Sequence, residues 1–156
     1  MEIIIKNLQK KIPIRPRQII PALHKILRSQ GLAETALCIT FVSAYKMRVL
    51  NKKYLNHDYV TDVLTFDFSE NKNTIAGEIV IAPSQALKNS RIYRTALNQE
   101  ILLYVIHGML HLLGYKDHHP ADIKRMRTRE EQLMKLLKIF LLIFLPGTLY
   151  SLPLAL

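Results

Sequence analysis

Two histidines four residues apart, His107 and His111, are the residues of this chain whose type and spacing could do chemistry. On a helix this spacing places both imidazoles on one face, so that they can share one metal ion. Gly114 can end that helix in a left-handed conformation and turn the chain back, which makes His118 the expected third ligand. Three imidazoles suit zinc or a similar divalent ion and leave a fourth position for water, as in catalytic sites.

Ordinary core histidines, satisfied by hydrogen bonds, are the alternative explanation of this pair. The segment around them, from about Leu97 to Leu113, is apolar nearly all round and is therefore expected to be a buried helix. Burying two imidazoles costs free energy unless both find partners, and one shared ion meets that need for both. The context favours a metal site.

The residue after the first histidine bears on the kind of hydrolysis. Zinc peptidases of the His-Glu-x-x-His kind carry their general base at that position, where this chain has Gly108. A water on the ion can still act near neutral pH, because its pKa falls to about 7 in known zinc sites. The sequence therefore predicts a metal-dependent hydrolase that uses a metal-bound water, with no general base assigned, and it disfavours peptide hydrolysis.

The composition is that of one basic globular domain. The chain has 156 residues, 49% of them hydrophobic, and its 22 Lys and Arg against 12 Asp and Glu give a net charge of +10. Such a balance favours a phosphate-rich partner or an anionic membrane surface, although a solvated basic surface explains the charge equally well.

The single cysteine and the start of the chain indicate the compartment. Cys38 excludes a disulfide framework and a cysteine-based zinc site, which fits a reducing environment. Residues 1–6 have an acidic residue and too short an apolar run for a signal peptide. A cytoplasmic protein is expected.

Hydrophobic patterning predicts an α+β fold. Strands are expected at about 3–5, 36–42, 62–68 and 75–82, the last two forming a hairpin. Helices are expected at about 16–30, 43–55, after Pro83, at 97–113 and from about Pro120. These elements make a small four-stranded sheet, mostly antiparallel or mixed, packed by about five helices, with a buried central helix that carries the histidines.

The end of the chain is uncharged from Ile139 to Leu156. Pro146, Gly147 and Pro153 interrupt this run, and the unbroken part is too short to cross a bilayer. We therefore expect one hydrolase domain over residues 1–145 and an apolar tail over 146–156. A tail that is packed, or that touches a membrane, is favoured over a spanning anchor.

Three motifs carry a resemblance to a known family. Residues 107–115 read His-Gly-Met-Leu-His-Leu-Leu-Gly-Tyr, and Asp-His follows at 117–118. Leu50-Asn51 and Tyr54 precede the segment 61–66, and Gly-Glu-Ile-Val-Ile occupies 77–81. With these motifs the chain resembles the YbeY family of bacterial endoribonucleases.

The resemblance implies an α+β fold, a zinc-type ion on three histidines and cleavage of single-stranded RNA. It also implies action in the maturation of the 3′ end of 16S rRNA and in ribosome quality control, with the small ribosomal subunit as partner. Two positions depart from the family pattern. Lys116 moves the histidine one place later, so that Asp117 or His119 are alternatives to His118, and Leu55 stands where the family often has arginine.

Basic and acidic residues elsewhere are candidates for supporting roles. Arg48, Lys52 and Lys53 lie on one predicted helix and are the nearest candidates to bind RNA, although a solvated basic face explains them equally well. Asp62 and Glu78 could orient a metal ligand or contact substrate, and strand-end capping or solvation is the alternative.

An endoribonuclease is the leading hypothesis. A metallopeptidase or amidase on the same histidines is the second. A ribosome- or RNA-binding module whose metal is structural is the third, and a fourth protein ligand would favour it.

Overall fold

The computed structural model describes residues 2–32, 34–71 and 73–144, and the tail predicted over 146–156 lies outside them. The elements follow in the order β1 (Glu2–Asn7), α1 (Pro16–Ser29), β2 (Glu34–Phe41), α2 (Ala44–Leu55), β3 (Val63–Asp67), β4 (Thr74–Ile81), α3 (Pro83–Tyr93), α4 (Leu97–Leu112) and α5 (Pro120–Phe144). Each strand and helix expected from the sequence is present, and the predicted α+β class is confirmed.

The four strands form one mixed sheet in the order β1-β2-β4-β3. β2 pairs in parallel with both β1 and β4, whereas β3 and β4 form the predicted antiparallel hairpin. The parallel pairs follow from the connections: α1 lies between β1 and β2, and parallel neighbours need such a crossover. Of the two sheet types that the sequence left open, the structure has the mixed one.

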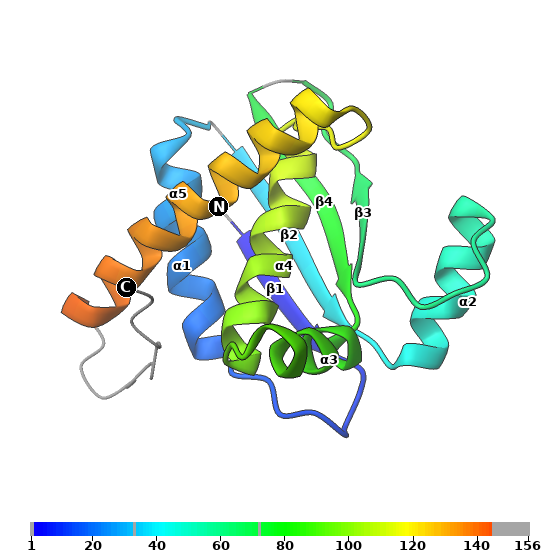
Figure 1. The fold of residues 1–156 in the computed structure, drawn as a ribbon. Helices are drawn as coiled ribbons and strands as arrows, with labels where there is room; N and C mark the ends of the chain where they lie inside the picture. The colour runs from blue at the N-terminus through cyan, green and yellow to red at the C-terminus, as the bar shows by residue number, and fades with distance from the viewer. Residues whose placement is uncertain (1, 33, 72, 145–156) are drawn as a thin grey trace.

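One face of the sheet carries the main core. Alternate residues of β2 and β4 point to it, and they pack with buried residues of α1, α4 and α5; the strand residues are Leu37, Ile39, Phe41, Ile75, Ile79 and Ile81. Figure 1 shows α4 lying along this face, with α5 crossing over it. The apolar segment around the histidines is thus a central helix, as predicted.

Helix α2 stands apart from this core. Its buried Met47 packs with Val42, Leu64, Val80 and Ala82 at one end of the sheet, and the rest of α2 projects to the side (Figure 1). Within the described part of the chain, no helix combines the length and the apolar character that a membrane span needs.

Candidate metal centre

The close approach of α4 to the sheet fixes where its histidines lie. Gly108 is buried, and a Cβ placed on it would lie 2.5 Å from Cγ2 of Ile79 in β4. Because Gly108 faces the sheet, the neighbouring His107 and His111 lie toward the edge of the interface, where each side chain is 28% exposed. The helix therefore presents two partly buried imidazoles at a surface that is open on one side.

The turn after α4 orients His111. Gly114, at φ +86°, ends the helix with hydrogen bonds from its own N–H to the carbonyl of His111 and from the Tyr115 N–H to the carbonyl of Leu110. This is the glycine stop predicted from the sequence. The Tyr115 carbonyl then accepts a hydrogen bond from Nδ1 of His111 at 3.2 Å. A carbonyl only accepts, so the Nδ1 of His111 carries the hydrogen and its Nε2 keeps a free lone pair.

A carboxylate from α5 orients the ring of His107. Oε1 of Glu130 lies 2.6 Å from Nδ1 of His107, and the Glu130 side chain is only 14% exposed. An ionised carboxylate can only accept, so Nδ1 of His107 donates and its Nε2 is also left with a lone pair.

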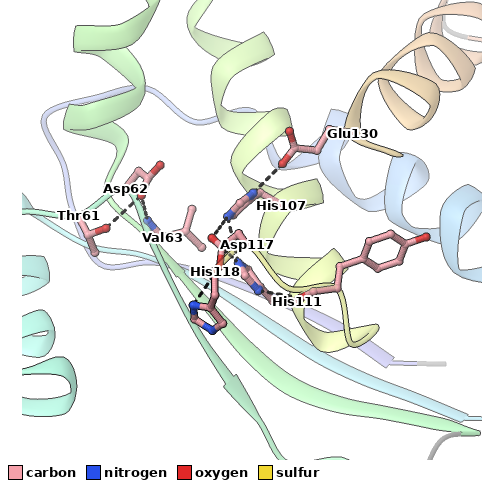
Figure 2. Close-up of polar contacts among 9 residues, drawn as sticks. Thr61, Asp62, Val63, His107, His111, Asp117, His118 and Glu130 are labelled. Carbon is pink, nitrogen blue, oxygen red and sulfur yellow. Dashed lines mark hydrogen bonds and ion pairs between the residues drawn. The ribbon is translucent and has the colours of Figure 1, made fainter. Parts of the chain in front are cut away.

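Three electron-pair donors consequently converge on one point (Figure 2). The Nε2 atoms of His107 and His111 are 3.1 Å apart. Oδ2 of Asp117 lies 3.9 Å from the first and 3.6 Å from the second. Facing lone pairs and a carboxylate repel one another unless a cation lies between them, and a proton can bridge only two of the three.

These residues fit a divalent metal ion. The ligand atoms of His107, His111 and Asp117 all lie within 4.8 Å of one another. Two nitrogens bound tetrahedrally to zinc at their usual distance are about 3.3 Å apart, close to the 3.1 Å observed between the Nε2 atoms. Two imidazoles with one carboxylate are also a ligand set that zinc and similar ions accept.

The electrostatic surroundings shift the pKa values of the two rings in opposite directions. Burial works against protonation of His107, but the hydrogen bond and charge of Glu130 outweigh it and raise the pKa of His107. Burial lowers the pKa of His111, and the neighbouring His107 lowers it further. His107 is therefore the ring that takes up a proton first, and His111 stays neutral to lower pH.

Two cavities meet at this cluster, and both are lined by Asp62, His107 and Asp117. The larger has a volume of about 480 Å³ and extends along β3 to Tyr54 and Phe66. The smaller, of about 320 Å³, extends toward α5. The donors therefore face an open space on both sides rather than a closed core.

Comparisons with known proteins identify the family of the chain. The family model described as Endoribonuclease YbeY matches residues 4–138. The chain belongs to the YbeY family.

Curated YbeY endoribonucleases resemble the chain over most of its length. The one from Amoebophilus asiaticus is 34% identical over 126 residues, which cover 81% of this chain and 85% of the relative. The one from Syntrophus aciditrophicus is 32% identical over 144 residues, with 88% and 90% covered. A Thermotoga maritima protein with a known solution structure superposes with a TM-score of 0.63 at 25% identity, covering 87% of this chain and 89% of its own.

The remaining predicted ligands lie between Gly114 and the start of α5. His118, the predicted third ligand, lines the larger cavity beside Asp117, with its Nδ1 4.0 Å from Oδ1 of Asp117 and its side chain 79% exposed. His119 is also exposed, and its carbonyl accepts from the Ile123 N–H at the start of α5. The structure thus brings Asp117 to the two helix histidines and leaves His118 at the rim.

The two acidic candidates lie in different places. Asp62 lines both cavities, and its Oδ1 accepts hydrogen bonds from the Val63 N–H and the Thr61 hydroxyl (Figure 2). Glu78 lines neither of these cavities, and its Oε1 accepts from the Thr40 hydroxyl at 2.6 Å. Of the pair, Asp62 alone faces the space in front of the histidines.

The three basic candidates of this YbeY member lie outside both cavities, on α2. Arg48 and Lys52 both pair with Asp58, at 2.8 and 3.1 Å. Nζ of Lys53 lies 5.1 Å from the centre of the Tyr54 ring, whose other neighbour Phe66 lines the larger cavity. They form an exposed basic surface next to the cavity, rather than part of its wall.

Glu130 is the functional residue that sequence analysis missed. It lies among the many charged residues of α5, yet it shares a helical face with Met126, Leu133 and Leu137, all of which are buried. A single carboxylate on an otherwise apolar face has to find a partner when the face packs. A lone carboxylate on an apolar helix face was therefore the sequence feature that could have indicated Glu130.

Proposed function

We propose that this chain is a metal-dependent endoribonuclease that cleaves single-stranded RNA in the cytoplasm. We further propose that it acts in maturation of the 3′ end of 16S rRNA and in ribosome quality control, with rRNA of the small subunit as substrate. The observation that supports the activity most strongly is the convergence of two Nε2 lone pairs and the Asp117 carboxylate in an open cleft. The curated relatives that the chain resembles over most of its length are named endoribonucleases.

The residues of the chain divide the work around the ion. A zinc-type ion supplies, when bound, a Lewis acid for the phosphodiester and a water that is acidic enough to attack near neutral pH. His107 and His111 present neutral nitrogens because Glu130 and the Tyr115 carbonyl hold their Nδ1 hydrogens. The general base stays unassigned.

The larger cavity suits an unpaired nucleotide. The rings of Tyr54 and Phe66 line it at a centroid distance of 4.9 Å and an interplanar angle of 71°. Tyr54 is 52% exposed and offers a face on which a base can stack. Bases of a duplex are already stacked and paired, so an aromatic wall of this kind favours single-stranded RNA. The net charge of +10 supports a polyanionic substrate.

The decisive experiment measures cleavage of single-stranded and duplex RNA by the purified protein, with added zinc or with a chelator. The wild type should cleave the single strand only when metal is present, and His111→Ala should lose cleavage. His57→Ala is the matched control, because His57 is an exposed histidine just after α2 that lines neither cavity at the cluster. Cleavage that survives the chelator, or the absence of cleavage with any divalent metal, contradicts the proposal.

The third ligand is a separate part of the proposal. We place it on the turn after Gly114, where His118 is the residue predicted from the sequence and Asp117 has the nearer atom. Zinc affinity is measured in His118→Ala and in Asp117→Asn by competition with a chromogenic chelator. The variant that removes a ligand should bind zinc at least tenfold more weakly than the wild type. Equal affinity in both variants and the wild type contradicts a ligand from this turn.

The same measurement bears on the structural-metal alternative. If both variants lose zinc affinity to a similar degree, Asp117 and His118 bind together with the two helix histidines and close the coordination shell. A closed shell of four protein ligands is typical of structural zinc. The metallopeptidase alternative is disfavoured by the fold itself, because position 108 faces Ile79 and has no room for a general base.

A further inference from the structure

The smaller cavity beside the histidines has a cationic side chain at its wall. Arg127 of α5 lines it together with His107, Asp117 and Glu130. Among the described residues that line either of the two cavities at the cluster, Arg127 is the one lysine or arginine. This position is distinct from the basic surface of α2, which borders the larger cavity.

Apart from the histidines, the other charged residues that line the two cavities are acidic. Asp62, Asp67, Asp117 and Glu130 are all lining residues. A phosphate chain entering this space meets several carboxylates, and a single divalent ion offsets only two of their charges. RNA that crosses the cluster therefore needs a further cation at the wall, and the described structure offers Arg127 there.

The side chain of Arg127 is also free to bind. It is exposed, and no ion pair or hydrogen bond of its side chain is found among the described residues. Its neighbours on α5 are engaged: Arg125 pairs with Asp122 at 2.7 Å, and Arg129 donates to Gln132 at 3.1 Å. The planar guanidinium presents two parallel N–H groups, which match a phosphate better than a lysine does.

We propose that Arg127 binds a backbone phosphate of the RNA, next to the phosphate that lies at the histidine cluster. The RNA then runs from the aromatic wall of Tyr54 and Phe66, across His107 and His111, to α5. Helix α5 then contributes two residues to the site. Glu130 orients His107, and Arg127, which lies one turn earlier on the helix, binds the substrate. This inference rests on the proposed ribonuclease function.

The test compares Arg127→Ala with Arg125→Ala, an exposed arginine of the same helix that lines neither cavity at the cluster. Binding of a fluorescent single-stranded RNA of about 12 nucleotides is measured by anisotropy, with chelator present so that the RNA stays intact. Arg127→Ala should weaken binding about tenfold. It should also reduce the slope of log K against log salt by about 0.7, the value for one lost contact to a single strand.

Two further results make the outcome unambiguous. Arg127→Lys should recover part of the affinity and the full salt slope, because it keeps the charge but not the paired N–H groups. Arg125→Ala should bind within twofold of the wild type. If the wild type binds and cleaves RNA but Arg127→Ala matches Arg125→Ala, this inference is wrong and the proposed function stands. If the wild type neither binds nor cleaves RNA, both are wrong.

Discussion

Helix α4 carries the two histidines predicted to bind metal, and helix α2 carries the basic residues predicted to bind RNA. The first helix is buried and the second is largely exposed. α4 is buried against β3 and β4 and is flanked by α3 and α5. α2 is anchored by two buried residues, Met47 and Asn51, and by the partly buried Leu50, while most of its other side chains are exposed. Figure 1 shows the first at the centre of the molecule and the second at its side.

The difference follows from what each set has to do. Metal ligands must be held within about half an ångström, and this accuracy requires a packed helix and partners that fix each ring. Contacts to an RNA backbone need charge within reach, which long side chains on an exposed helix supply. Substitutions in α4 and its partners should therefore have large effects on stability and metal binding, and substitutions in α2 should have small ones.

Gly108→Ala should give the largest effect on stability. The added methyl would lie 2.5 Å from Cγ2 of Ile79, so that α4 has to move away from the sheet. We expect a loss of about 1–3 kcal/mol in the free energy of unfolding, measured by denaturant titration. Lys53→Ala on α2, an exposed change, should stay within about 0.5 kcal/mol of the wild type. A Gly108→Ala protein as stable as the wild type would show that α4 is not tightly packed.

Glu130→Gln should give the largest effect on metal binding by a residue outside the ligand set. The amide can still accept from Nδ1 of His107, but the negative charge that raises the pKa of this ring is lost. We expect zinc affinity to fall about tenfold, and about a hundredfold in Glu130→Ala, measured by chelator competition. Glu131→Gln is the control, because Glu131 is exposed and outside the cluster. Equal affinities in all four proteins would remove Glu130 from the site.

Local pattern was enough to predict the elements of the fold. The apolar run of α4, the alternation in β3 and β4, and the glycine at 114 each act over a few residues, and the structure has the corresponding helix, hairpin and turn. Apart from the β3–β4 hairpin, the neighbours within the sheet were not predicted. The order β1-β2-β4-β3 depends on how α1 and α4 cover one face, and such long-range packing has no short signature in the sequence.

In the candidate site, too, the local features could be predicted from the sequence and the long-range contacts could not. His107 and His111 meet because four residues span about one helical turn, which the sequence shows directly. The position of Asp117 relative to His118 depends on how the turn accommodates Lys116, and spacing alone leaves that open. Glu130 lies 23 residues beyond His107 and reaches it only because α5 crosses α4. The contact between Glu130 and His107 depends on how α4 and α5 pack against each other, and local sequence pattern does not show this packing.

Tyr54→Ala tests whether the end of α2 takes part in the cleft. Loss of the ring removes the proposed stacking surface, and we expect affinity for single-stranded RNA to fall about fivefold, measured by anisotropy. Tyr54→Phe should bind like the wild type, because the ring face is kept. Tyr45→Ala is the matched control, since Tyr45 lies on the same helix, is 78% exposed and lines no cavity at the cluster. Equal losses in Tyr45→Ala and Tyr54→Ala would indicate a general effect on α2.

Asp58→Asn should give the smallest effect, and it tests the basic surface of α2. The hydrogen bond from Arg48 lowers the pKa of Asp58, with Lys52 adding to the shift. A lowered pKa stabilises the folded state above the unfolded value of about 3.9 and loses that effect as the pH falls through the folded value.

Because this carboxylate is exposed, with 48% of its side chain accessible, we expect no measurable change in stability at pH 7. The variant instead releases Arg48 and Lys52, so RNA affinity at low salt should rise about twofold, and the gain should vanish at about 0.5 M salt, where charges are screened. An unchanged affinity at low salt would mean that α2 contributes no charge to RNA binding, and that the wall of the cleft, with Arg127, holds the substrate without it.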